Sequence, residues 1–391
     1  MVLPLRPESI SPAPPSAPAS AVPATLGWDT AWDETFATHA DAGRRAARVI
    51  AVHKETAIVR SADGHDRPAG VTGRFRFEAL APSDYPAVGD WVALEPDAPS
   101  TGPDDQAVIA AVLPRRSAFV RSAADASRRT AGNLADEQVI AANVDIAFLV
   151  AGLDGDFNLR RLERYLAVAW SSGVTPVIVL NKADVARDLE DRLIAVESIA
   201  PGVPVVTVSA LTGDHLADLA VHLTPGRTAV VLGSSGVGKS TLLNALLGEE
   251  RQTTGAVRGS DSRGRHTTTH RELFVLPTGA LLIDTPGIRS LEVAGADEGV
   301  ETTFEDITDL AATCRFSDCR HEGEPGCAVR EALLAGTLTQ ERLESQRKLE
   351  RELAHVERKG DPRAMAEERR KWRIIHKTVD KQMDRKYGRE R

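Results

Sequence analysis

A phosphate-binding motif occupies residues 233–240, which read Gly-Ser-Ser-Gly-Val-Gly-Lys-Ser and fit the pattern Gly-x-x-x-x-Gly-Lys-Ser/Thr. The glycines allow backbone amides to wrap around phosphate oxygens, and the helix expected to begin near Lys239 adds positive potential. Lys239 would contact the β- and γ-phosphates, and the Ser240 hydroxyl would bind magnesium. The predicted phosphate-side residues are Gly233, Ser234, Ser235, Gly236, Val237, Gly238, Lys239, Ser240 and Thr241.

A second magnesium-side motif, Asp-Thr-Pro-Gly, begins at Asp284 after the apolar run 280–283. An aspartate at the carboxyl end of a buried strand, on the P-loop side of the sheet, is placed to hold magnesium. The amide of Gly287 would then sense the γ-phosphate. Residues 263–270 lie between the two motifs, and a threonine there would complete the magnesium coordination. We favour Thr268 for this role, with Thr267 next.

The choice of base is predicted by Asn181, Lys182, Ala183 and Asp184, which follow the apolar run 176–180. A carboxylate can accept hydrogen bonds from both N1–H and the 2-amino group of guanine, whereas adenine offers neither donor. Asp184 would therefore select guanine. Asn181 would brace the loops, and the stem of Lys182 would lie over the base. Ser209 and Ala210, after the next expected strand, would supply an amide to the guanine O6.

All three cysteines of the chain, Cys314, Cys319 and Cys327, fall within 14 residues, with His321 among them. Three thiolates and one imidazole complete a tetrahedral zinc site. A site with no open position is structural rather than catalytic, so one Zn²⁺ would clamp the start of a C-terminal helical region.

The elements that position these motifs change along the chain. Residues 1–40 form an Ala- and Pro-rich extension that we expect to be disordered. Five short strands, expected over residues 48–52, 56–60, 73–77, 88–94 and 107–112, indicate a small barrel. An oligonucleotide-binding (OB) barrel and an SH3-like barrel both fit this pattern. From residue 144 onward, strand patterns alternate with helical ones, which predicts a parallel sheet covered by helices.

The order of the motifs is unusual, because Asn181 and Ser209 precede Gly233. In ordinary small GTPases the P-loop comes first and the base-reading loops come last. The same sheet can be closed from another starting strand when the termini lie close together, so the order predicts a circularly permuted core. The segment after Gly287 runs directly into the C-terminal region, and we expect the nucleotide state to move that region.

At this point the chain resembles the circularly permuted, small-ribosomal-subunit-dependent GTPases of bacteria, over roughly residues 44 to 380. The resemblance rests on the motif order, on residues 264–269 and on the cysteine cluster. It implies an N-terminal OB barrel, a permuted P-loop GTPase domain and a mainly helical zinc-binding domain. The implied boundaries are residues 41–118, 119–300 and 301–391.

The resemblance also implies GTP and GDP as ligands, Mg²⁺ as cofactor, and the 30S ribosomal subunit and its 16S rRNA as partners. It further suggests that the protein ejects an assembly factor such as ribosome-binding factor A. Ile288 follows Gly287 where many small GTPases carry a water-orienting glutamine. In the family a histidine is assigned that role, which corresponds to His266 here.

Composition and charge bear on whether the protein binds membranes or nucleic acids. No apolar run approaches the roughly 20 residues that cross a bilayer, and the N-terminus lacks a secretory pattern, so we expect a cytoplasmic monomer with no membrane partner. The net charge is -8, yet residues 358–391 hold 13 Lys or Arg against 6 Asp or Glu. Residues 44–76 hold 8 against 3. Such basic segments can contact phosphate backbones, although a solvated helix face would look the same.

Two other functions fit part of the pattern. A P-loop ATPase or kinase would share the phosphate motif, although Asn181 and Asp184 disfavour it. A non-catalytic RNA-binding scaffold would hold GTP without turning it over.

Overall fold

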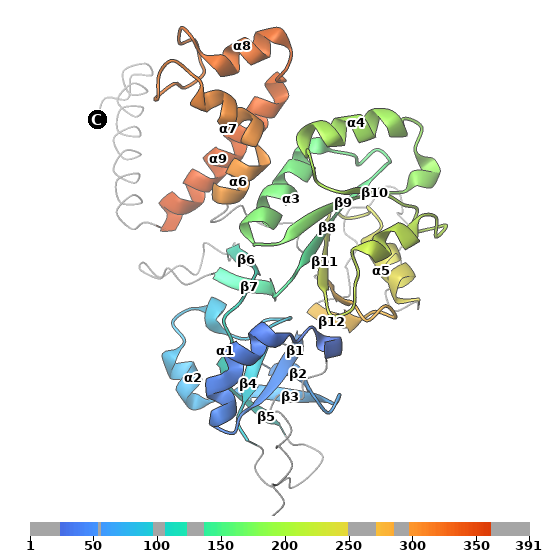
Figure 1. Cartoon of the computed structure of the whole chain (residues 1–391), viewed down its shortest axis with the longest axis vertical. Coiled ribbons are helices and arrows are strands. Elements are labelled where there is room, and N and C mark those ends of the chain that lie inside the picture. The colour runs from blue at the N-terminus through green and yellow to red at the C-terminus, as the bar shows by residue number, and fades with distance from the viewer. Residues whose placement is uncertain are drawn as a thin grey trace, which may run out of the picture.

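The computed structural model describes residues 24–53, 56–96, 106–122, 137–248, 271–284 and 297–360, with side chains up to residue 354. Three parts follow one another along the long axis: a barrel, a sheet flanked by helices, and a group of helices (Figure 1). The predictions for His266, Thr267, Thr268, Gly287 and the basic tail after residue 360 lie outside the described residues.

The barrel is built from the first five strands, β1(Arg45–His53), β2(Thr56–Ser61), β3(Asp66–Val71), β4(Trp91–Leu94) and β5(Ala107–Val112). Their order is β1-β2-β3-β5-β4, and pairing of β1 with β4 closes the barrel. Strand β3 runs parallel to β5, whereas the other barrel neighbours are antiparallel. The parallel pair excludes a simple up-and-down meander and fits the Greek-key OB barrel.

One of the expected strands, residues 73–77, is instead the short helix α2(Gly73–Glu78). The Thr72 side chain caps this helix by accepting a hydrogen bond from the Phe75 amide at 3.0 Å. The third barrel strand is β3, where Pro68 and Gly70 had obscured the strand pattern in the sequence. The alternation of arginine and phenylalanine over residues 74–77 imitated a strand, but it lies on an exposed turn of helix.

The prediction that residues 1–40 are disordered is wrong for its last part. Residues Thr30–Asp41 form helix α1, preceded by the short turn η1(Ala24–Leu26). Asp29 caps the helix by accepting from the Trp32 amide at 3.1 Å. Trp32 and Phe36 are buried, and the Trp28 ring meets Trp91 of the barrel edge-on, with 4.7 Å between centroids. The aromatic side chains bury enough apolar surface to order this helix against the barrel.

The central sheet has the order β10-β9-β8-β11-β13-β12. All neighbours among β8 to β11 and β13 are parallel, and β12 is antiparallel to β13. The strands are β8(Ile146–Gly152), β9(Thr175–Asn181), β10(Val205–Thr207), β11(Thr228–Gly233), β12(Arg271–Val275) and β13(Leu281–Asp284). Strands β8 and β11 are buried along their whole length, as expected for parallel strands covered on both faces.

Helices cover both faces of this sheet: α3(Leu159–Ser171), α4(Leu189–Ile199) and α5(Lys239–Leu247), with shorter turns η2(Pro82–Asp84), η4(Ala183–Val185) and η5(Leu216–Val221) elsewhere. A separate hairpin, β6(Ala118–Ser122) and β7(Glu137–Ala142), lies between the barrel and the central sheet. None of the helices in the described part of the chain has the length and apolar character that crossing a bilayer requires.

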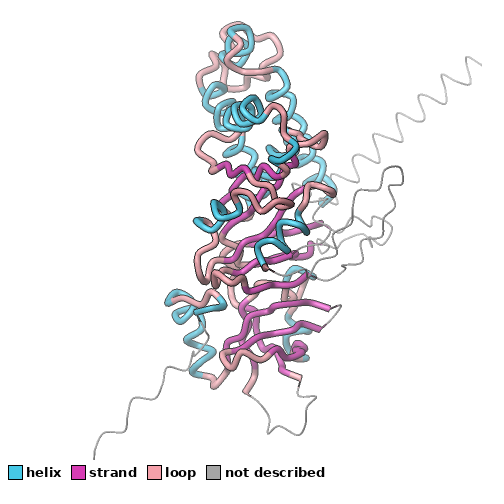
Figure 2. Tube along the Cα trace, turned by 90° about the vertical axis from the view of Figure 1, so that its right-hand side faces the viewer, coloured by secondary structure: helices cyan, strands magenta, loops and turns pink. Residues whose placement is uncertain are grey.

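The barrel and the central sheet form one continuous ladder, which Figure 2 shows as a row of strands along the molecule. Barrel strand β1 pairs with β12 through Ala51 and Val52. Beside this junction, the buried Arg48 donates to the Gly89 and Asn143 carbonyls and to the Thr228 hydroxyl, at 3.2, 3.1 and 2.9 Å. Burial lowers the pKa of Arg48 to about 10. These bonds connect barrel and core.

The C-terminal part consists of α6(Asp297–Thr303), α7(Glu305–Ala312), α8(Ala328–Ala335) and α9(Gln340–Gly360). Helices α6 and α9 lie against α3 of the central domain (Figure 1). The contact includes a buried ion pair between Glu163 of α3 and Arg342 of α9. Arg342 also pairs with Asp306, and its guanidinium lies 4.7 Å from the centre of the Phe304 ring.

Candidate nucleotide site and metal centre

The predicted nucleotide residues meet at one edge of the central sheet. Strand β11 lies between β8 and β13, and it leads directly into residues 233–238. Because the carboxyl ends of parallel strands open at the same edge, the loops after β8, β9, β10, β11 and β13 all face this edge. Asp284 is the last residue of β13 and lies there as well.

The phosphate loop adopts the shape that its glycines allow. Gly236 and Gly238 have φ angles of 84° and 95°, in the region that favours glycine. Helix α5 starts at Lys239, and it contains Ser240 and Thr241 in its first turn. The Lys239 ammonium donates to the carbonyls of Gly233 and Ser234 at 2.9 and 2.5 Å.

Asn181 joins the base-side loops to the phosphate loop. Its side chain is almost fully buried, donates to the Val237 carbonyl at 2.8 Å and accepts from the Ala210 amide at 2.9 Å. A Cβ atom on Gly238 would lie 2.4 Å from the Asn181 amide nitrogen, so only glycine fits there. The Asn181 side-chain amide therefore connects its own loop to the loop of Ala210 and to the phosphate loop.

Asp184 and Ser209 are also brought together. The buried Ser209 hydroxyl donates to the Asp184 carboxylate at 2.6 Å, and the Ala183 amide donates to the Val208 carbonyl at 3.1 Å. Lys182 has a left-handed backbone with φ of 68°, and its ammonium donates to the Gly236 carbonyl at 2.6 Å. Residues from 181–184, 209–210 and 233–238 thus converge, although they are separated along the chain.

A loop that the sequence prediction missed, residues 153–158, completes this edge. Asp154 accepts from the Lys182 ammonium at 2.5 Å. Asp156 pairs with Arg161 at 2.7 Å and accepts from the Ser234 hydroxyl. Burial alone would raise the pKa of both carboxyls, but hydrogen bonds from Lys182 to Asp154, and from Ser234 and Arg161 to Asp156, lower each pKa below its usual value. The sequence signal that could have indicated this loop is Asp154-Gly155-Asp156, two carboxylates flanking a glycine shortly after a buried strand.

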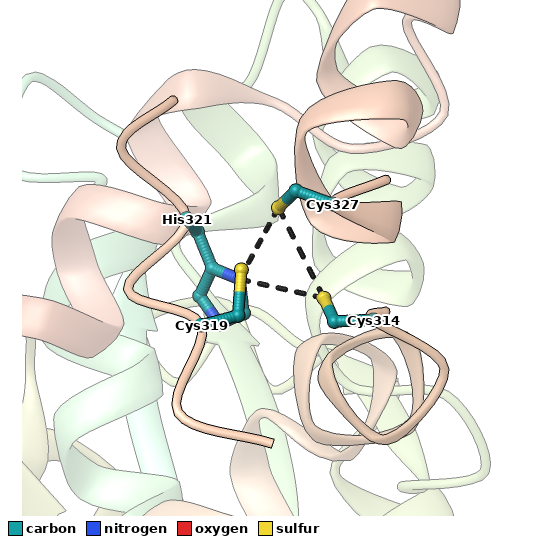
Figure 3. Close-up of side chains that lie close together, drawn as sticks. All are labelled: Cys314, Cys319, His321 and Cys327. Atoms are coloured by element: carbon teal, nitrogen blue, oxygen red, sulfur yellow. Dashed lines mark hydrogen bonds between the residues drawn. The ribbon is translucent and has the colours of Figure 1, made fainter. Parts of the chain in front are cut away.

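The four predicted metal ligands point toward one another (Figure 3). The Cys314 sulfur lies 3.9 Å from the Cys327 sulfur and 3.6 Å from Nδ1 of His321, which lies 3.3 Å from the Cys327 sulfur. Ligands bonded tetrahedrally to zinc at about 2.3 Å are separated by about 3.8 Å. The ligand atoms, which all lie within 4.8 Å of one another, fit a single Zn²⁺.

Local structure holds the four ligands in place. Cys327 caps α8 by accepting from the Arg330 amide at 3.4 Å, and His321 has a left-handed backbone with φ of 59°. Partial burial and the neighbouring thiols raise the pKa of Cys319 to about 11. A bound dication favours the thiolate, so it would oppose that shift.

The order of strands and motifs defines a circularly permuted P-loop GTPase, since the base-side loops precede the phosphate loop in one sheet. A curated relative, the small ribosomal subunit biogenesis GTPase RsgA of Opitutus terrae, is 49% identical over 90% of this chain and 95% of its own length. The protein of the same name from Streptomyces coelicolor is 44% identical over 89% of this chain and 91% of its own length. The chain belongs to the RsgA GTPase family and is a GTP hydrolase.

Three further matches agree. The family model described as RsgA GTPase matches residues 112–294. The crystal structure of YjeQ from Thermotoga maritima aligns with a TM-score of 0.57 and 29% identity, covering 80% of this chain and 99% of that one. The structure of YloQ, a circularly permuted GTPase, aligns with a TM-score of 0.54 at 25% identity, covering 81% and 96%. The family and the fold class predicted from the sequence are confirmed.

Proposed function

We propose that the protein is a GTPase of late 30S ribosomal subunit maturation and that the subunit stimulates its turnover. The observation that carries this proposal is the convergence of the loops containing Asn181, Asp184, Ser209 and Lys239 at one sheet edge. Relatives that resemble the chain over most of its length carry the name small ribosomal subunit biogenesis GTPase.

In the proposed site, the amides of residues 233–238 and the Lys239 ammonium hold the phosphates of GTP or GDP. Ser240, Thr268 and Asp284 would bind Mg²⁺, and the ion would supply positive charge beside the phosphates. Asp184 selects guanine, Ser209 orients that carboxylate, and the Ala210 amide faces the guanine O6. The amide of Gly287 senses the γ-phosphate, and His266 orients the attacking water.

The proposed Zn²⁺ is structural. Cys314, Cys319, His321 and Cys327 would fill its four positions, which leaves none for a substrate. Its role would be to tie the turn before α8 to the end of α7.

The proposed partner is 16S rRNA within the 30S subunit. The OB barrel belongs to a class of fold that binds oligonucleotides, and the basic residues of the barrel and of the tail favour phosphate contacts. We further propose that the nucleotide state controls rRNA binding and the release of assembly factors such as ribosome-binding factor A. The protein would act as a monomer in the cytoplasm.

GTP turnover with and without purified 30S subunits tests the proposal, with 50S subunits as the control. We expect stimulation by 30S subunits alone. No stimulation would remove the proposed coupling of the enzyme to the subunit, and no turnover with or without subunits would leave a scaffold that merely holds GTP. Equal turnover of ATP and GTP would favour a P-loop ATPase or kinase.

A further inference from the structure

Residues Asp156 and Arg161 touch the phosphate loop, and no motif of the sequence assigns them a role. They come from the β8–α3 connection, because β8 lies directly beside β11 in parallel register, with Val150 opposite Gly233. The loops that leave these two strands must therefore run side by side. Asn158 caps α3 by accepting from the Arg161 amide at 3.0 Å, which places the Arg161 side chain in the first turn of the helix.

The three side chains close a triangle. Arg161 Nη1 donates to the Ser234 hydroxyl oxygen at 2.6 Å and to Asp156 Oδ2 at 2.7 Å, and the Ser234 hydroxyl donates to the same carboxylate oxygen. Each of the three side chains is therefore hydrogen-bonded to the other two. Hydrogen bonds to charged groups are roughly twice as strong as those between neutral groups, so the triangle fixes the Ser234 side chain.

Ser234 is held from its other side by Lys239. The lysine ammonium donates to the Ser234 carbonyl at 2.5 Å and to the Gly233 carbonyl at 2.9 Å. Ser234 therefore contacts Arg161 and Asp156 through its hydroxyl group, and its backbone carbonyl accepts a hydrogen bond from Lys239. Any displacement of Ser234 would displace the carbonyl that orients Lys239.

We propose that Arg161 and Asp156 are positioning residues of the phosphate loop, acting through Ser234 to fix the conformation in which Lys239 meets the nucleotide. This inference rests on the proposed assignment of residues 233–241 to the phosphates. The positive charge of Arg161 also balances the negative charge of Asp156. Loss of the arginine leaves the Asp156 carboxylate unbalanced beside the phosphate loop, and GTP carries one more phosphate than GDP. The effect should therefore be larger for GTP.

The experiment measures kcat/KM for GTP and the affinities for GTP and GDP in the full chain. Arg161→Ala and Ser234→Ala should each lower kcat/KM about tenfold, and the double variant should lose about as much as either single one, because both break the same contact. Arg161→Ala should lower the ratio of GTP to GDP affinity. Arg161→Lys, which keeps the positive charge, should restore that ratio. The melting temperature of the nucleotide-free protein reports separately on folding.

Arg160→Ala is the matched control, since Arg160 lies on the same turn but pairs with Glu163 at 2.8 Å instead of touching the phosphate loop. Its kcat/KM should stay within about twofold of the wild type. Equal behaviour of Arg161→Ala and Arg160→Ala, or additive losses in the double variant, would overturn the inference. Retained turnover in Lys239→Ala would instead overturn the assignment of the phosphate loop, so the two failures are distinguishable.

Discussion

Oε1 of Glu163, on helix α3 of the GTPase domain, lies 3.0 Å from Nη1 of Arg342, on helix α9 of the C-terminal domain. The Glu163 side chain is fully buried, and the Ser345 hydroxyl donates to its second oxygen at 2.5 Å. Arg342 also donates to the Thr303 carbonyl at 2.7 Å. Both charges are thus enclosed by partners, and the pair joins helix α9 of the C-terminal domain to the helix that begins near the phosphate loop.

Glu163→Gln should destabilise this contact, because it removes the buried carboxylate that pairs with Arg342 and leaves the partly exposed Asp306 as the countercharge of a buried guanidinium. The free energy of unfolding should fall by about 3 kcal/mol, as measured by chemical denaturation followed by circular dichroism. The matched control is Glu352→Gln, which removes a partly exposed partner of Arg164 between the same two helices and should cost at most about 1 kcal/mol. Equal losses in the two variants would contradict the argument.

Lys239→Ala should abolish GTP turnover while leaving the fold intact, because the lysine would contact the β- and γ-phosphates and its ammonium donates to two carbonyls of the phosphate loop. Turnover is measured by phosphate release, and the fold by circular dichroism. Wild-type turnover in this variant would refute the role assigned to Lys239.

Asp184→Asn should shift the base preference from guanine toward xanthine. An asparagine can still accept from N1–H, but it presents its amide donors where guanine has an amino group and xanthine has an oxygen. We expect the affinity for GTP to fall by about 10- to 100-fold and the affinity for xanthosine triphosphate to rise. Competition binding with GTP, ATP and xanthosine triphosphate checks this, and an unchanged order of affinities would place Asp184 outside the pocket.

Removal of zinc should loosen the C-terminal helices, because Cys314 follows α7 and Cys327 caps α8, so an ion held by the cluster would join the two helices. A chelator, or Cys319→Ser, should lower the melting temperature and expose the helices to protease. Metal analysis of the untreated protein should give about one zinc per chain. A melting profile insensitive to the chelator would argue against a structural metal.

Gly89→Ala should destabilise the junction between barrel and core. Gly89 has a φ of 91°, and a Cβ atom there would lie 2.1 Å from the Ala142 carbonyl oxygen. We expect a loss of at least about 2 kcal/mol in unfolding free energy from strain and overlap. Gly64→Ala is the control, because Gly64 has a φ of 75° but no atom within 4 Å of the added Cβ. A similar loss in both variants would show that the overlap at Gly89 is relieved.

The sequence predicted the parts of the fold that carry local patterns. Strands β8, β9 and β11 appear as continuous apolar runs, and the cysteine spacing predicted the cluster that the structure brings together. Helix α1 was missed because its order depends on packing of Trp32 and Phe36 against a barrel elsewhere in the chain. The role of residues as distant as Glu163 and Arg342 depends on tertiary contact, which periodicity does not record.

The same limit applies at the site. The positions of Asn181 and Lys239 followed from motifs, whereas Asp156 and Arg161 lie in a loop with no recognised pattern. Their contact with Ser234 exists only because β8 and β11 are neighbours in the sheet. The roles expected for His266, Thr268 and Gly287 stay predictions.

The shared backbone bonds between Ala51 and Val52 of β1 and the first residues of β12 have a mechanical consequence. Strand β12 is thereby hydrogen-bonded to the barrel on one side and to β13 of the central sheet on the other. A force applied to the barrel would therefore be transmitted through β12 to β13, whose last residue is Asp284.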